Sequence, residues 1–130
     1  MDYRKEIQTR DTLIRLREDG ILETRITPSD NMRHELEDAR AVMAAVVEVS
    51  AGKMRPLLNI LGDIYVTSEA QKYYRDHPQA AIASAMVVNS FLQRLIGNIF
   101  LKYSTLPIPT KLFENEEKAN QWLQSFFEEP

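Results

Sequence analysis

The sequence predicts a single α/β domain with one mixed, mostly parallel sheet, in the order β-β-α-β-α-β-α-β-α with helices packed on it. Two observations support this class. The chain has 130 residues, of which 44% are hydrophobic, which is the size and composition of one domain. After the first two strands, every apolar run is followed by a helical pattern, and right-handed crossovers make such strands parallel. We expect the domain to span residues 1–130, with residues 1–10 as a flexible N-terminal arm.

The domain opens with two β-rich runs, at residues 12–17 and 21–27. Asp19 and Gly20 separate them, and an Asp-Gly pair favours a type I′ hairpin turn, in which both central residues need a positive φ. Arginines alternate with aliphatic residues in both runs. One face of the hairpin is therefore expected to be solvated, and the hairpin to lie toward an edge of the sheet.

The first helix is expected to start at the turn and capping residues 28–31 and to end at Gly52, which suits the left-handed position after a helix. His34 falls on its charged face, and His34 with Glu37 alone is a weak metal signal, so we expect a solvated surface there. The opposite, apolar arc carries Met32, Leu36, Ala39, Met43, Val46 and Val47.

The second half of the chain repeats the strand–helix pattern. A buried strand is expected at 54–61, followed by a helix that Thr67 or Ser68 caps and that extends to about Asp76. A continuous apolar run at 80–88 predicts a central strand. A third helix is expected at 91–104 and a last strand at 110–113. Glu114 and Asn115 cap a final helix, whose apolar face carries Ala119, Trp122, Leu123, Phe126 and Phe127.

Composition argues against several classes of function. The 16 Lys and Arg against 19 Asp and Glu give a net charge of −3, which supplies no basic field for nucleic acid. The chain has no cysteine, only two histidines distant in sequence, and four isolated glycines that form no nucleotide-binding motif. We therefore expect no enzyme activity, no metal and no cofactor. With no signal peptide and no apolar stretch near membrane-spanning length, a cytoplasmic protein without a transmembrane segment is expected.

The predicted fold class also indicates where a ligand or partner would bind. Ligands of open parallel sheets bind beyond the carboxyl ends of the strands, here the loops at 62–68 and 89–90. The helix N-termini there favour an anion or a phosphoryl group, although the Thr, Ser and Asn residues can instead serve only as helix caps. The candidate binding residues are Asp63, Tyr65, Thr67, Ser68, Glu69, Asn89, Ser90 and Arg94.

The expected third helix has an apolar arc that covers roughly half its circumference, which is wider than a surface helix needs. Phe100 lies in this arc and Leu101 lies outside it. Three uses stay open: packing on the core alone, packing on the core plus a homodimer contact, and contact with a membrane surface or lipid. Phe100 and Leu101 are the candidate contact residues.

The element order and three segments carry a family resemblance. The segments are IGNIFL at 96–101, PIPTKLF at 107–113 and EEKANQWL at 116–123. The element order resembles that of STAS domains, the fold of bacterial anti-sigma-factor antagonists of the SpoIIAA type. The three segments look like those of small uncharacterised bacterial STAS-like proteins. The resemblance implies a non-enzymatic module of bacterial signalling that acts by binding a protein partner. We also expect a homodimer, with the third helix as the contact.

The resemblance also implies a modification site. In the antagonists, a partner kinase phosphorylates a serine of an Asp-Ser-Ser-Gly motif that opens the second helix. The corresponding stretch here places Glu69 at the usual acceptor, so a fixed negative charge replaces the switchable one, and leaves Thr67 and Ser68 as candidate acceptors. Some STAS-like proteins resemble carriers or sensors of small ligands. The alternative function is therefore binding of a lipid-like or nucleotide ligand between the third helix and the sheet.

Overall fold

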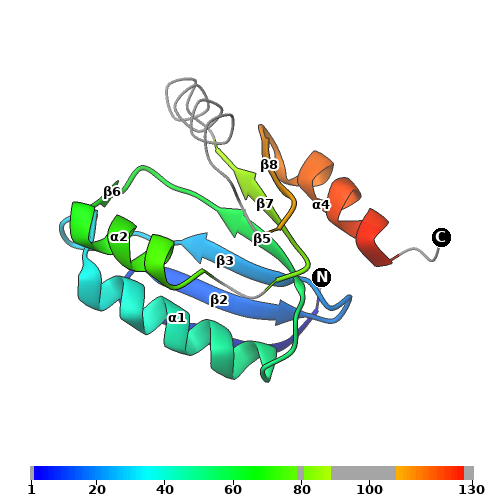
Figure 1. Cartoon of the computed structure of the whole chain (residues 1–130), viewed down its shortest axis with the longest axis horizontal. Helices are drawn as coiled ribbons and strands as arrows, with labels where there is room; N and C mark the ends of the chain where they lie inside the picture. The colour runs from blue at the N-terminus through cyan, green and yellow to red at the C-terminus, as the bar shows by residue number, and fades with distance from the viewer. Residues whose placement is uncertain (1, 79–80, 89–107, 128–130) are drawn as a thin grey trace.

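The fold is seen in a computed structural model that describes residues 2–78, 81–88 and 108–127 (Figure 1). Within these residues a six-stranded sheet has the order β1-β2-β3-β5-β7-β8. The first three strands are antiparallel neighbours, and β3, β5, β7 and β8 are parallel, so the predicted mixed, mostly parallel α/β sheet is confirmed. The strands are β1 (Tyr3–Gln8), β2 (Thr12–Arg17), β3 (Leu22–Ile26), β5 (Pro56–Ile60), β7 (Ala83–Val87) and β8 (Thr110–Phe113).

Helices cover both faces of this sheet. The helices α1 (Leu36–Ser50) and α2 (Ser68–Asp76) lie side by side on one face, and α4 (Glu116–Gln124), which continues into the 3-10 turn η1 (Ser125–Phe127), lies on the other (Figure 1). Asn115 caps α4 by accepting a hydrogen bond from the Lys118 N–H, as the sequence predicts. None of the helices in the described ranges is long and apolar enough to cross a membrane.

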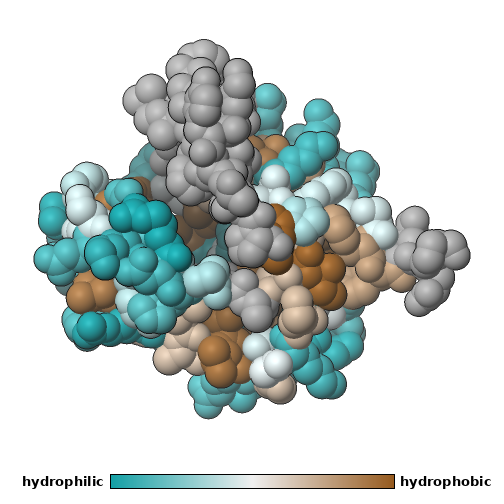
Figure 2. Space-filling view, viewed as in Figure 1, coloured by the Kyte–Doolittle hydropathy of each residue, from teal (hydrophilic) through white to brown (hydrophobic). Residues whose placement is uncertain are grey.

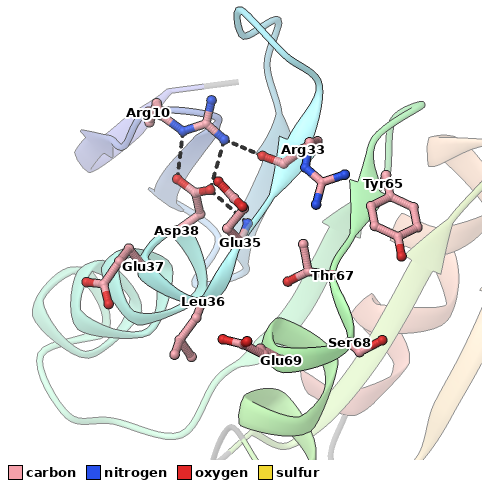
Figure 3. Close-up of a pocket in the computed structure, with 10 residues that line it drawn as sticks. All are labelled: Arg10, Arg33, Glu35, Leu36, Glu37, Asp38, Tyr65, Thr67, Ser68 and Glu69. Carbon is pink, nitrogen blue, oxygen red and sulfur yellow. Dashed lines mark hydrogen bonds and ion pairs between the residues drawn. The ribbon is translucent and has the colours of Figure 1, made fainter.

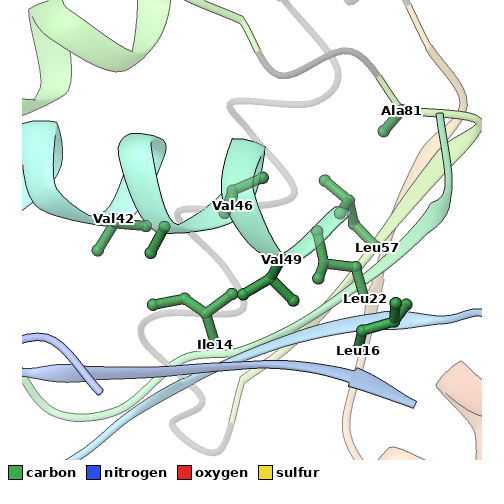
Figure 4. Packing of buried hydrophobic residues seen from close by; sticks show 9 residues of the cluster. Ile14, Leu16, Leu22, Val42, Val46, Val49, Leu57 and Ala81 are labelled. Carbon is green, nitrogen blue, oxygen red and sulfur yellow. The ribbon is translucent and has the colours of Figure 1, made fainter. Parts of the chain in front are cut away.

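Strand alternation divides the core into two layers. Because successive side chains of a strand point to opposite faces, Leu57 packs beneath α1 while its neighbour Leu58 packs beneath α4. The α1 layer, drawn in Figure 4, also contains Ile14, Leu16, Leu22, Val42, Ala45, Val46, Val49 and Ala81. The α4 layer contains Ile21, Ile60, Ala83, Ala85, Val87, Ala119 and Leu123. The sheet thus separates two apolar layers, which is the arrangement expected when helices cover both faces.

Two very short strands lie outside the main sheet. They are β4 (Arg33–His34) and β6 (Tyr65–Val66), which form a parallel ladder, called here the β4–β6 pair. Two backbone hydrogen bonds of 3.0 Å, from Tyr65 N to Met32 O and from Thr67 N to His34 O, hold the ladder together. The β4–β6 pair therefore fixes the start of α1 beside the start of α2.

The N-terminal segment and the hairpin differ from expectation. The flexible arm predicted for residues 1–10 is wrong over Tyr3–Gln8, because this segment is β1 and forms the edge of the sheet beyond β2. The turn is also not of type I′, since Gly20 has a φ of +92° while Asp19 does not have a positive φ. Asp19 instead organises a longer loop, with its carboxylate accepting hydrogen bonds from the Arg17 guanidinium and from the Ile21 N–H.

The polar face of the hairpin is not simply solvated. The Glu23 carboxylate is buried between two guanidinium groups, at 2.6 Å from Arg15 and 3.5 Å from Arg25. Arg25 also pairs with Glu116 at the start of α4, at 2.8 Å. Arg15 and Arg25 are therefore engaged in ion pairs with Glu23, and Glu116 of α4 covers part of this face.

The first helix starts later than predicted and presents a different face to the core. It begins at Leu36 rather than at 28–31, because residues 33–34 belong to β4. The predicted arc was phased from Met32, which lies outside the helix, and so it misplaced Val47, which is 62% exposed. The buried face keeps Ala39 and Val46 of the predicted arc and also includes Val42 and Val49, the latter 1% exposed.

The observed orientation of α1 predicts that two of its valines differ in their contribution to the free energy of unfolding. Val49→Ala should lower the free energy of unfolding by about 2 kcal/mol, because two buried methyl groups are lost. Val47→Ala should change it by less than about 0.5 kcal/mol, since that side chain is largely in solvent. Urea denaturation of both variants measures this, and equal losses would contradict the helix phase described above.

Candidate functional site

A surface hollow lies where the N-terminal ends of α1 and α2 meet, beside the β4–β6 pair (Figure 3). Both helices start at the same end of the domain, as Figure 1 shows. The hollow has a volume of about 730 Å³. It is lined by Arg10, Arg33, Glu35, Leu36, Glu37, Asp38, Tyr65, Thr67, Ser68 and Glu69.

An arginine and a tyrosine form one rim of the hollow. Arg33 and Tyr65 are register partners in the β4–β6 pair, so their side chains project from the same face of the ladder. The Arg33 guanidinium carbon lies 5.1 Å from the centroid of the Tyr65 ring, within cation–π range. Both residues are exposed, Tyr65 by 58%, and Met32, which precedes Arg33 in the chain, is also exposed. The rim therefore presents a cationic and aromatic surface to solvent, with an exposed methionine next to it in sequence.

The first turn of α2 forms the opposite side. The Thr67 hydroxyl accepts a hydrogen bond of 3.3 Å from the Ala70 N–H, which confirms Thr67 as the helix cap. Ser68 and Glu69 are exposed, Ser68 on the side of Tyr65 and Glu69 on the side of Leu36 (Figure 3). Of these hydroxyls, Thr67 serves the backbone while Ser68 faces solvent.

A bidentate ion pair fixes the start of α1. Arg10 donates to both Asp38 oxygens, from Nε to Oδ1 at 2.7 Å and from Nη2 to Oδ2 at 2.8 Å, and also to the Arg33 carbonyl. The Glu35 N–H donates to Asp38 Oδ2 at 2.8 Å. The hydrogen bond from Arg10 lowers the pKa of Asp38 below its ordinary value, against a smaller opposing effect of burial. The loop between β1 and β2 is thereby tied to the first turn of α1.

Next in sequence to Arg10 and Arg33 of the hollow are Asp11 and His34, which form a hydrogen-bonded chain with Tyr74. It is called here the buried chain, although Tyr74 itself is half-buried. Asp11 is 0% and His34 is 3% exposed. His34 Nδ1 lies 2.7 Å from Asp11 Oδ2, and His34 Nε2 lies 2.7 Å from the Tyr74 hydroxyl oxygen. The His34 and Tyr74 rings are stacked, with centroids 5.8 Å apart. Burial raises the pKa of Tyr74, and the charges of Asp11 and Asp38 add to this effect.

The buried chain corrects the prediction that His34 lies on a solvated helix face. His34 is in β4, where Arg33 is exposed and the next side chain, that of His34, is buried, as the alternation of a strand requires. The prediction was wrong because it extended the first helix through residues 33–34. A histidine at that position of a strand meets Asp11 and Tyr74, which are 23 and 40 positions away in sequence.

A different set of side chains, Asp11, His34 and Asp38, carries the donor types of a metal site. Ligand atoms of Asp11, His34 and Asp38 all lie within 4.8 Å of one another. However, both nitrogens of His34 are already in hydrogen bonds, and both oxygens of Asp38 are held by Arg10. The guanidinium supplies the positive charge that the two carboxylates need, so this donor set does not fit a metal ion.

The structure brings together four of the predicted site residues, namely Tyr65, Thr67, Ser68 and Glu69, which all line the hollow. Asp63 is exposed in the loop before β6 and is not among the lining residues. The other predicted residues, Asn89, Ser90, Arg94, Phe100 and Leu101, lie outside the described ranges, as does the expected third helix.

Sequence reasoning missed the α1 side of the hollow. Those residues are Arg10, Arg33, Glu35, Leu36, Glu37 and Asp38. One signal was available, because Glu35 and Asp38 have the spacing of an N-cap residue and the third helical residue, which often bond reciprocally. A two-residue strand such as β4 leaves no periodic signal in a sequence.

The sheet order and helix layers define an α/β domain with a SpoIIAA-like fold. An uncharacterised protein of the DUF3478 family from Shewanella loihica PV-4, described as having this fold, is similar with a TM-score of 0.58 at 15% identity, over 92% of this chain and 90% of that one. A protein of unknown function from Arthrobacter sp. FB24 is 28% identical over 91% of this chain and 96% of that one, with a TM-score of 0.30.

The sequence gives a closer assignment than the fold. The family described as "Domain of unknown function (DUF7793)" matches residues 14–127, and this chain belongs to it. No curated protein matches the chain. The similarity to the Shewanella protein supports the expected STAS-like fold. A fold does not by itself determine a function, which depends on the residues of the site.

The Arg10–Asp38 pair predicts a specific pH dependence. A carboxyl whose pKa is lowered by folding adds stability above its ordinary pKa of 3.8, and this stability is lost as the pH falls through the lower, folded value. In the Arg10→Met variant the Asp38 pKa should return toward its ordinary value. The free energy of unfolding of the wild type should therefore fall more steeply below about pH 4 than that of the variant.

Urea denaturation as a function of pH measures this difference. Arg40→Met is the matched control, because it removes an exposed pair with Glu37 on the same helix. Identical pH dependence in the wild type and the Arg10→Met variant would show that the pair does not hold Asp38 ionised.

Proposed function

We propose that this protein is a non-enzymatic, STAS-like module that binds a protein partner at the hollow between the starts of α1 and α2. The observation that carries the proposal is the exposed stack of Arg33 on Tyr65 at the rim, with the exposed Met32 next to Arg33 in sequence. Arginine, aromatic residues and methionine are enriched at protein interfaces, and Arg and Tyr recur among the residues that dominate binding energy.

The state of the polar groups supports binding over catalysis. A catalytic base must be able to reach a substrate, but His34 is buried with both ring nitrogens engaged. Asp38 is held by Arg10, and the Thr67 hydroxyl caps α2. Among the residues that line the hollow, the polar groups therefore serve structure or face solvent, as in a recognition surface.

Ser68 is the phosphoacceptor that we propose, in preference to Thr67. Its side chain is exposed in the first turn of α2, where the helix dipole stabilises negative charge, whereas the Thr67 hydroxyl is engaged as a cap. Intact-mass analysis of protein from its own host tests this with two variants. Ser68→Ala should abolish a phosphoryl adduct that Thr67→Ser retains, and an adduct that survives in Ser68→Ala would contradict the assignment.

Other parts of the expected function fall on residues that the structure does not describe. A ligand between the third helix and the sheet, and a homodimer through Phe100 and Leu101, both depend on residues 89–107. These, the bacterial signalling role and the cytoplasmic location stay predictions. A small molecule found on the purified protein by native mass spectrometry would favour the ligand-binding alternative.

The proposal predicts which surface residues a partner needs. Tyr65→Ala and Arg33→Ala should each weaken partner binding by roughly tenfold or more, because each removes one half of the exposed stack. A partner captured by cross-linking from the host and identified by mass spectrometry can be purified, and its dissociation constant measured by calorimetry for each variant.

Lys118→Ala is the matched control, because it removes an exposed cation from α4 on the opposite face of the sheet. The control should bind as the wild type does. A partner whose affinity is unchanged by Tyr65→Ala and Arg33→Ala, or whose cross-links map to α4, would place the binding surface elsewhere.

A further inference from the structure

We infer that α2 opens and closes against the domain as a separate unit, and that the buried chain of Asp11, His34 and Tyr74 holds it closed. The inference concerns an element that carries Ser68 and Glu69, so its consequence for partner binding rests on the function proposed above. The opening itself does not, because it follows from how α2 is attached.

Buried apolar side chains attach α1 to the rest of the domain, whereas α2 has few of them. Of the nine residues of α2 only Ala70 is buried, Tyr73 and Tyr74 are half-buried, and the outer surface of the helix is mostly hydrophilic (Figure 2). In α1 the buried residues are Asp38, Ala39, Val42, Ala45, Val46, Val49 and Ser50. An element with so little buried apolar surface is expected to unfold or detach locally before the core does.

Polar contacts take the place of the missing apolar ones. At its start, α2 is attached through the β4–β6 pair, in which Thr67 N donates to His34 O. Two turns further on, the Tyr74 hydroxyl meets His34 Nε2 at 2.7 Å, and the two rings stack. His34 is thus used twice, by its backbone at one end of the helix and by its side chain near the other.

The protons of the buried chain can be placed. The Thr12 hydroxyl donates to Asp11 Oδ1 at 2.9 Å, and the Arg10 guanidinium lies 3.5 Å from Oδ2, so Asp11 is surrounded by donors and acts as an ionised acceptor. His34 Nδ1 must then carry the hydrogen that it shares with Asp11, and in the neutral imidazole Nε2 accepts from the Tyr74 O–H. Burial raises the pKa of Tyr74, so its hydroxyl keeps the proton that it donates.

Removing the Tyr74 hydroxyl should therefore release α2. The Tyr74→Phe variant keeps the ring stacked on His34 but leaves Nε2 buried without its donor, a loss that favours the detached state. Solvent can satisfy Nε2 only when α2 moves away. The charged groups that face His34 from other elements, Asp38 and Arg10, stay paired with each other and offer no substitute donor to Nε2.

Hydrogen exchange measured by mass spectrometry on the full chain tests this without any partner. In the wild type, amides of α2 should exchange faster than those of α1 and β5. In Tyr74→Phe, exchange over residues 71–77 should rise roughly fivefold or more, while exchange in β5 and β7 stays unchanged.

Tyr73→Phe is the matched control on the same helix. It keeps the stacking of ring 73 on His77, and its hydroxyl has no hydrogen-bond partner among the described residues. Equal exchange of α2 in the two variants would overturn the inference, as would faster exchange throughout the domain in Tyr74→Phe. If Tyr74→Phe does not fold, the exchange rates of the wild type decide the question. Amides of α2 that exchange as slowly as those of α1 in the wild type would overturn the inference. Because no partner is present, this result is independent of the Tyr65→Ala and Arg33→Ala binding test.

Discussion

Asp11 is a carboxylate with no exposed surface, and the hollow is arranged around the need to satisfy it. An ionised group in such a position is tolerated only when donors surround it. Thr12 and His34 supply hydrogen bonds, and the guanidinium of Arg10 supplies positive charge nearby. The position of His34, and through it the position of β4, follows from this single requirement.

Two adjacent residues in the loop just before β2 thereby fix the positions of two helices. Arg10 holds the first turn of α1 through Asp38, and Asp11 holds α2 through His34 and Tyr74. The β4–β6 pair connects the two helix starts and displays Arg33 and Tyr65 outward (Figure 3), while His34 is buried. The buried polar contacts and the exposed rim are therefore two sides of the same short ladder, so a partner that binds the rim, as proposed, would contact the strand pair to which α2 is attached.

Local patterns predicted the parts of the fold that depend on local physics. The alternation of apolar strands and helices gave the sheet, and the helix caps at Thr67 and Asn115 followed from residue type and spacing. Two of the errors share a cause. His34 was misplaced and Val47 was assigned to the core because both were phased on a helix that starts later, at Leu36. Nothing local reports that β4 pairs with β6 or that Asp11 lies beside His34, since these contacts join distant segments.

The most direct test of the account is the protonation of the two ring nitrogens of His34. Long-range proton–nitrogen NMR correlations of the histidine side chains at neutral pH distinguish Nδ1–H from Nε2–H imidazole. The account predicts that His34 carries its hydrogen on Nδ1, shared with Asp11, and that Nε2 is the unprotonated acceptor of the Tyr74 hydroxyl. A His34 ring protonated on Nε2 alone would mean that Asp11 is not the ionised anchor of the chain, and would contradict the account.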